Sequence, residues 1–224
     1  MKKTKRVYPR RVRALRRAAV ALALLLFCSL VLHVGLLLPI QALRVCEQNQ
    51  GVYERTRVVQ RRLEPGMMHP IDVLYLTEGE NTLSLFCTNP GLFGWTDGFV
   101  WPVDTSDGGD VQAGAVSMTR EGKERVLVFY GRVRGTEEME LNGSVRTEDW
   151  NDAEKGLQIH AYGHGIGEED RVVRDGYTYF IFVEPDPVPE ETRSRLPCYY
   201  QLFVERGGEH IAYEITQTAS VFWG

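Results

Sequence analysis

The chain lacks the short motifs that mark common catalytic and cofactor sites. It contains no Gly-x-Ser-x-Gly elbow, no phosphate-binding loop, no His-Glu-x-x-His helix and no Cys-x-x-Cys pair. Its five histidines could form a catalytic triad in space, but nothing in their spacing indicates one. These absences favour a non-catalytic protein over an enzyme, and they predict that the protein needs no cofactor.

Acidic residues are absent from the first 42 positions, where nine lysines and arginines precede an uncharged apolar run of 23 residues, Ala18 to Ile40. A helix of that length would be ~35 Å long, enough to cross a hydrocarbon core of ~30 Å. Basic residues that flank a transmembrane helix stay in the cytoplasm, so the N-terminus should lie inside and the C-terminus outside. The sequence therefore predicts a basic cytoplasmic tail (1–17), a transmembrane signal-anchor helix (18–42) with residues 18–40 in the bilayer, and an extracytoplasmic domain (43–224).

The alternative for this segment is a cleaved signal peptide. Its apolar region is normally about 7–15 residues, which is shorter than the run found here. We therefore expect a retained anchor and a single-pass protein of the cell membrane.

The predicted extracytoplasmic domain is acidic. It holds all 30 Asp and Glu residues but only 17 of the 26 Lys and Arg residues, so its net charge is near −13, against −4 for the whole chain. Phosphate binding needs a basic surface, and this argues against nucleic acid as a partner.

Helix-forming patterns are scarce after residue 43, where short apolar runs alternate with turn residues. This spacing predicts an all-β domain, a sandwich of which the immunoglobulin fold is one example, with a barrel as the alternative. The continuous run Val126–Tyr130 predicts a central strand covered on both faces. The expected strands are Val52–Val59, Ile71–Leu76, Thr82–Cys87, Val111–Thr119, Glu124–Val133, Met139–Arg146, Leu157–Tyr162, Tyr177–Glu184, Tyr199–Glu205 and His210–Gln217.

The last two of these strands form the clearest predicted hairpin, joined at Gly207 and Gly208. The period of two in the second strand places Ile211, Tyr213 and Ile215 inward. Two short helices are also expected, over Asp149–Gly156 and Pro189–Leu196.

Three cysteines lie outside the predicted span, where disulfides can persist. Cys87 ends one expected strand and Cys198 begins another, so these two are the disulfide candidates. Cys46 follows the span closely and could join two copies of the protein at the membrane surface, giving a homodimer. The alternative is that all three remain thiols.

An aromatic stretch is the best ligand-site candidate. Trp95, Phe99 and Trp101 would share one face of an extended segment and could stack on a sugar ring or line a peptide groove. Large aromatic residues are usually mostly buried, so a core position is favoured over a binding platform.

Two further segments carry metal-type side chains. His160, His164 and Glu168 form a zinc-like inventory, but in a continuous strand the two histidines would stand ~13 Å apart, so a glycine-rich turn is favoured over a metal site. The acidic loop Asp104–Asp110 could bind calcium, but it lacks EF-hand spacing, and a solvated loop is favoured.

The sequence leaves two classes of function open. The leading hypothesis is an interaction module that binds an envelope protein, a cell-wall component or a copy of itself through loops and edge strands. The alternative is a membrane-tethered hydrolase or glycan-binding enzyme that uses the aromatic stretch and the region of His160 and His164.

Overall fold

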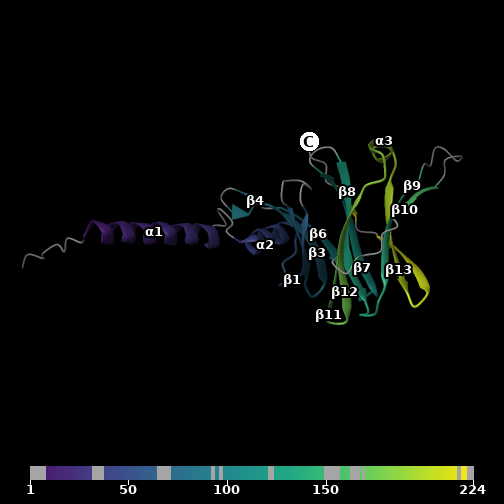
Figure 1. Cartoon of the computed structure of the whole chain (residues 1–224), viewed down its shortest axis with the longest axis horizontal. Coiled ribbons are helices and arrows are strands. Elements are labelled where there is room, and N and C mark those ends of the chain that lie inside the picture. Colours follow the sequence, from purple (N-terminus) through teal and green to yellow (C-terminus); the bar gives the residue numbers. More distant parts are fainter. Residues whose placement is uncertain are drawn as a thin grey trace, which may run out of the picture.

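A computed structural model of the chain describes residues 9–31, 38–64, 72–91, 94–95, 98–120, 124–148, 157–161, 167, 170–215 and 218–220. These residues form a long N-terminal helix and a β body of stacked sheets (Figure 1). The body consists mainly of antiparallel strands, so the predicted all-β class is confirmed.

The N-terminal segment differs from the single long helix that the sequence predicts. Helix α1 spans Arg10–Val31 and helix α2 spans Pro39–Asn49, while residues 32–37 lie outside the described residues. Within the part of the chain that the structure describes, no helix is both long enough and apolar enough to cross a membrane. The predicted boundary between residues 42 and 43 falls inside α2, because Pro39 takes the first helical position and starts a new helix there.

The strands form three stacked sheets and one short hairpin, with every pair antiparallel except β15 and β7. The first sheet consists of β1 (Arg57–Glu64), β2 (Asp72–Glu78), β3 (Thr82–Thr88) and β6 (Phe99–Asp104). The central sheet consists of β11 (Arg171–Arg174), β12 (Tyr177–Pro185), β8 (Glu124–Arg134), β7 (Val111–Arg120) and β15 (Thr218–Ser220). The third sheet consists of β10 (Leu157–Ala161), β9 (Glu140–Glu148), β13 (Cys198–Arg206) and β14 (Glu209–Ile215). The separate short hairpin consists of β4 (Pro90–Gly91) and β5 (Gly94–Trp95).

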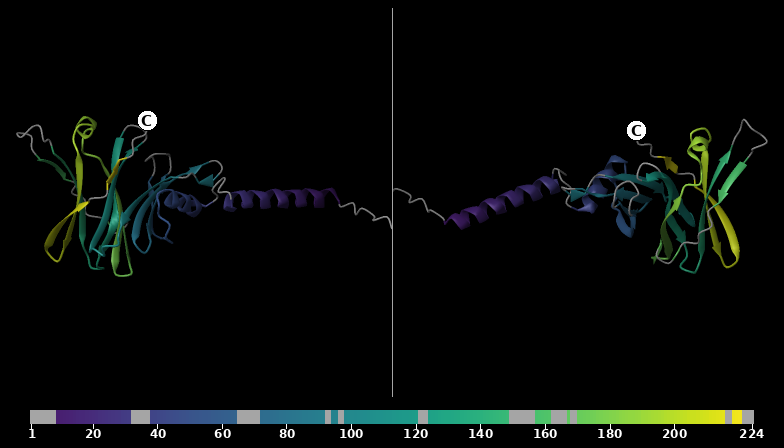
Figure 2. Two further views of the ribbon diagram at one scale, coloured as in Figure 1. Left: turned by 180° about the vertical axis from the view of Figure 1, so that it is seen from behind. Right: turned by 45° about the horizontal axis from the view of Figure 1, so that its top comes forward.

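The layers follow one another away from α1 in the order α2, first sheet, central sheet, third sheet (Figure 2). The central sheet is apolar on both faces. Val128 and Tyr130 pack against the first sheet, and the alternate residues Leu127 and Phe129 pack against the third. The prediction that Val126–Tyr130 is a central strand is therefore confirmed, but the body has three stacked sheets where a sandwich has two.

Helix α2 covers the outer face of the first sheet with Ala42, Leu43 and Cys46. The adjoining Glu47 is buried and accepts hydrogen bonds from the hydroxyls of Thr56 at 2.7 Å and Thr77 at 3.1 Å. These contacts tie the segment after α2 to the helix, so β1 begins at Arg57 and not at Val52 as predicted.

The predicted hairpin of β13 and β14 is confirmed, with Gly207 at φ 58° and Gly208 at φ 83° in the turn. Ile215 is buried, while the alternate residues of β14 are exposed, as the period of two requires. The short helix α3 (Glu190–Arg193) lies where a helix was predicted. The other predicted helix, Asp149–Gly156, lies outside the described residues.

Candidate binding groove

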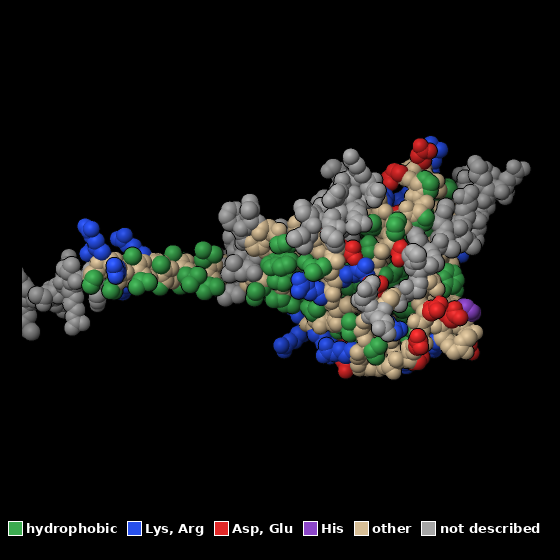
Figure 3. All heavy atoms as spheres, viewed as in Figure 1, with side chains coloured by type: hydrophobic (Ala, Val, Ile, Leu, Met, Phe, Trp, Pro, Cys, Tyr) green, Lys and Arg blue, Asp and Glu red, His purple; other side chains and the backbone are tan. Residues whose placement is uncertain are grey.

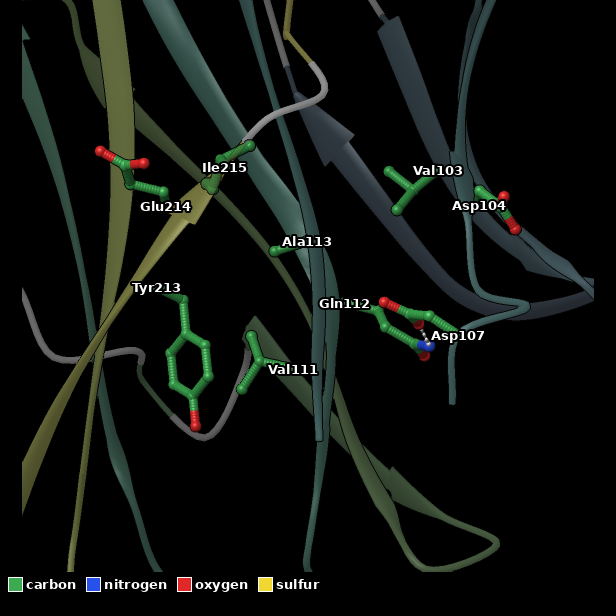
Figure 4. Close-up of a pocket in the computed structure, with 9 residues that line it drawn as sticks. All are labelled: Val103, Asp104, Asp107, Val111, Gln112, Ala113, Tyr213, Glu214 and Ile215. Atoms are coloured by element: carbon green, nitrogen blue, oxygen red, sulfur yellow. Dashed lines mark hydrogen bonds between the residues drawn. The ribbon is translucent and has the colours of Figure 1, made fainter. Parts of the chain in front are cut away.

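On one side of the β body, the edge strands β6 of the first sheet and β14 of the third sheet lie near β7 of the central sheet. Strands β6, β7 and β14 enclose there a cavity of about 290 Å³, which we call the edge groove (Figure 4). The residues that line it are Val103, Asp104, Asp107, Val111, Gln112, Ala113, Tyr213, Glu214 and Ile215.

Strand β7 turns backbone hydrogen-bonding groups toward the edge groove. The N–H of Arg134 in β8 donates to the carbonyl of Asp110 at 2.7 Å, so these two residues form a hydrogen-bonded pair of the antiparallel ladder. Such pairs alternate along a ladder, and Val111 and Ala113 therefore point their N–H and C=O groups away from β8. Within the described part of the chain, these outward groups have no hydrogen-bond partner.

Strand β15 shows that this edge of β7 accepts an added strand. Its residues Thr218–Ser220 pair in parallel with Ala115–Ser117. Among the described residues, the preceding part of β7, Val111–Gly114, has only β8 as a strand neighbour. Among the residues that the structure describes, this stretch of β7 is thus an open strand edge next to the part that β15 occupies.

The first-sheet side of the groove is acidic. The carboxylate of Asp104 accepts a hydrogen bond from the backbone N–H of Ser106 at 2.9 Å, and that of Asp107 accepts from the backbone N–H of Gly109 at 3.0 Å. These bonds to the charged form lower the pKa of both carboxyl groups below the usual value. Both groups are therefore ionised at neutral pH.

Gln112 links this acidic loop to β7. Its Nε2 donates to the carbonyl of Thr105 and to Oδ1 of Asp107, both at 3.0 Å. Its Oε1 accepts from Nε of Arg132 at 2.6 Å. The loop predicted as solvated is thus held in one arrangement by its own backbone and by a buried amide.

The third-sheet side of the groove is mainly apolar. Val111 and Ala113 point toward β14, where Tyr213 and Ile215 face them (Figure 4). Glu214 lies between these two residues, with its side chain 59% exposed and paired with Arg146. A ligand in the groove would meet carboxylates on one side and an apolar wall with a phenol on the other.

The neighbouring edge of β6 is less suited to strand pairing. Pro102 lies within that strand and has no N–H to donate. Proline on an edge strand blocks the addition of further strands. This makes β7 the better acceptor of the two.

The predicted aromatic platform is not formed by its three residues together. Phe99 and Trp101 stack with ring centroids 5.9 Å apart between the first and central sheets, where Trp101 is only 7% exposed. Trp95 packs on the opposite face of the first sheet, beside α2. Trp101 therefore lies in the core, which was the favoured of the two expectations.

The predicted metal residues fall largely outside the part of the chain that the structure describes. His164 and Glu168 lie outside the described residues, and for His160 only the backbone, in β10, is described. Elsewhere in the described chain, no group of three or more His, Cys, Asp and Glu side chains is placed to hold a metal ion.

The cysteines are not arranged as the predicted pairings require. Cys87 is a buried thiol between the first and central sheets, whereas Cys198 packs against the core on the far side of the central sheet. That sheet separates them, so the predicted Cys87–Cys198 disulfide is absent. Cys46 lies on the buried face of α2 and is 4% exposed, with Sγ 3.2 Å from the carbonyl oxygen of Gly98, and in this position it cannot reach a second copy.

Most of the groove residues were missed by sequence reasoning. The acidic loop was noted, but as a calcium candidate or a solvated loop. The alternation in β14 identified Tyr213 and Ile215 as inward-facing, yet no sequence signal places them opposite Val111 and Ala113. That juxtaposition depends on how the three sheets stack.

No family model, curated protein or solved structure matches this chain.

Proposed function

We propose that the protein is a single-pass membrane-anchored interaction module whose β body binds an extended, cationic segment of another envelope protein. The edge groove carries this proposal, because it is lined both by Val111 and Ala113, whose backbone groups point away from β8, and by the ionised carboxylates of Asp104 and Asp107. Strand edges bind extended peptides through main-chain hydrogen bonds. Carboxylates at the rim select lysine or arginine side chains by charge complementarity.

The anchor is supported by the exposure of α1. Figure 1 shows this helix extending away from the β body, and the large apolar side chains of its uncharged part include Leu22 at 61% and Leu24 at 59% exposed. After Arg17 this helix carries no charged residue, and a helical segment that is apolar all round is favoured in an apolar environment. The uncharged run from Ala18 to Ile40 has 23 residues, more than the roughly 20 that a helix needs to cross one bilayer core.

The charge on either side of the apolar run supports the orientation. Nine basic residues precede Ala18 and no acidic residue occurs before Glu47. Such a bias places the N-terminus in the cytoplasm and the β body outside. The partner would therefore be a protein of the cell envelope.

The experiment below also distinguishes other possible occupants of the edge groove. A second copy could add one of its strands at the same edge, and a cell-wall component could use only the carboxylates. The alternative of a hydrolase or glycan-binding enzyme has less support, because Trp101 is buried in the core and does not line the groove.

The proposal is tested with Ala113→Pro in the full chain, purified in detergent. Proline removes the outward N–H of residue 113 but no hydrogen bond to β8, so the fold should be kept. The probes are a short peptide of alternating lysine and valine and a matched peptide with glutamate in place of lysine. Fluorescence polarisation should show binding of the lysine peptide to the unchanged protein and at least ~10-fold weaker binding to the variant, as expected for losing ~1.5 kcal/mol of hydrogen bonding.

Val173→Pro is the matched control, since Val173 is 51% exposed on β11, the opposite edge of the central sheet. It should leave peptide binding unchanged. Equal binding of the lysine and glutamate peptides would contradict the proposed charge selectivity. Binding that survives Ala113→Pro would exclude strand addition at β7. A concentration-dependent dimer of the unchanged protein that Ala113→Pro abolishes would identify a second copy as the occupant.

A further inference from the structure

The segment closest to α1 carries charge of the opposite sign to the rest of the β body. Residues 38–63, which comprise α2 and most of β1, contain five arginines and two glutamates, whereas residues 64–224 contain 28 acidic and 12 basic residues. Figure 3 shows the same division in space, with basic and apolar side chains at the end of the body nearest α1 and most acidic side chains farther away.

Two arginines of this segment are available for an external partner. Arg55 and Arg61 are exposed, and among the described residues neither has a carboxylate partner. The guanidinium of Arg61 lies 5.9 Å from the ring centroid of Tyr75 on the outer face of the first sheet, the face that α2 covers. These charges therefore point away from the sheet core.

Exposed apolar side chains accompany the two arginines. Leu38 is 53% exposed and Ile40 39% exposed at the start of α2, and beyond the helix Tyr53 is 82% and Leu63 58% exposed. Leu63 shares the outer face of the first sheet with Arg61, two residues earlier. Basic, aromatic and aliphatic side chains together are typical of surfaces that lie in the headgroup region of a bilayer.

We propose that this surface, formed by Leu38, Ile40, Tyr53, Arg55, Arg61 and Leu63, rests on the bilayer and contacts anionic phospholipid headgroups. The inference rests on the proposed anchor, which would hold α2 within a few residues of the membrane. Anchoring confines the body to the surface, so even weak contacts would keep it docked. The acidic remainder, with the edge groove, would then be turned away from the anionic lipid.

The test uses the full chain in nanodiscs of phosphatidylcholine alone and of phosphatidylcholine with phosphatidylglycerol. Hydroxyl-radical labelling measures how fast Tyr53 and Leu63 are oxidised, with Tyr213 in the edge groove as an internal reference. Each arginine at an anionic surface is worth about fivefold in the docking equilibrium. Oxidation of Tyr53 and Leu63 should therefore be at least about threefold slower on the anionic discs, while Tyr213 is unchanged.

Arg55→Gln with Arg61→Gln should remove this protection, and Arg195→Gln with Arg206→Gln, which changes two arginines elsewhere on the body, should not. Equal oxidation on both kinds of disc, or protection that survives the Arg55 and Arg61 changes, would overturn the lipid contact while leaving the anchor intact. A chain that fails to co-elute with either disc would refute the anchor and the contact together. Peptide binding at the edge groove is measured separately and is decided by neither result.

Discussion

Replacement of Glu78 by Gln should destabilise the body strongly, because this carboxylate joins the first and central sheets. Its Oε2 accepts from Nη2 of Arg57 at 2.8 Å, and its Oε1 accepts from the hydroxyl of Tyr179 at 2.6 Å and from Arg132. The Glu78 and Arg132 side chains are only 10% and 11% exposed. Removing the negative charge leaves a nearly buried guanidinium without its counter-ion.

The expected loss is about 3 kcal/mol of unfolding free energy. Deleting one member of a buried ion pair costs ~3–5 kcal/mol. The lower end applies, since Arg132 keeps Oε1 of Gln112 at 2.6 Å and the Tyr177 ring at 4.5 Å. The matched control is Glu214→Gln, which breaks an ion pair whose carboxylate is 59% exposed and should cost only ~0–1 kcal/mol.

Chemical denaturation of the full chain, followed by circular dichroism, measures both variants. Burial alone would raise the pKa of Glu78, but the hydrogen bonds from Tyr179 and Arg57 and the charge of Arg132 hold it below its ordinary value of 4.5. A lowered folded pKa gives stability that is present above the unfolded pKa and lost as pH falls through the folded one. The difference between the unchanged protein and Glu78→Gln should therefore be complete at neutral pH and shrink below about pH 4.5. A loss under ~1 kcal/mol, or a difference that acid does not change, would refute this reasoning.

Three further substitutions test the packing. Trp101→Ala should cost ~3–5 kcal/mol in denaturation experiments, because the ring is buried and stacked on Phe99; a neutral result would place it outside the core. Gly143→Ala should cost ~1–3 kcal/mol in the same assay, since the added Cβ would lie 2.8 Å from the Phe129 ring. Cys46→Ser should leave migration on a non-reducing gel unchanged, because the thiol is buried between α2 and the first sheet; loss of a dimer band would contradict this burial.

Those strands could be predicted whose side-chain pattern is set by a few neighbouring residues in the sequence. The run Val126–Tyr130 is apolar at every position, and only a strand covered on both faces can bury such a run, so its central place followed from sequence. The turn at Gly207 and Gly208 was likewise predictable, because glycine is the residue type that readily adopts positive φ.

Helix α2 was missed for a physical reason. Its first residues, Pro39 and Ile40, continue the apolar character of the preceding segment, and its apolar residues Ala42, Leu43 and Cys46 bury themselves only because the first sheet supplies a matching face. At the junction of a transmembrane segment and a short amphipathic helix, both sequences are apolar, so the boundary cannot be read from the sequence. Only the face of the first sheet, against which α2 packs, shows where α2 begins.

By itself, the sequence determined the β class of the body, its central strand, its clearest hairpin and the uneven distribution of charge along the chain. Each of these depends on side-chain periodicity or composition within a few neighbouring residues. Only the tertiary structure decided that three sheets stack, that Cys87 and Cys198 lie on opposite sides of the central one, and that β6, β7 and β14 enclose a groove. The groove joins residues more than a hundred positions apart, such as Val103 and Ile215. Such contacts are set by which faces pack together, a choice that no local pattern encodes.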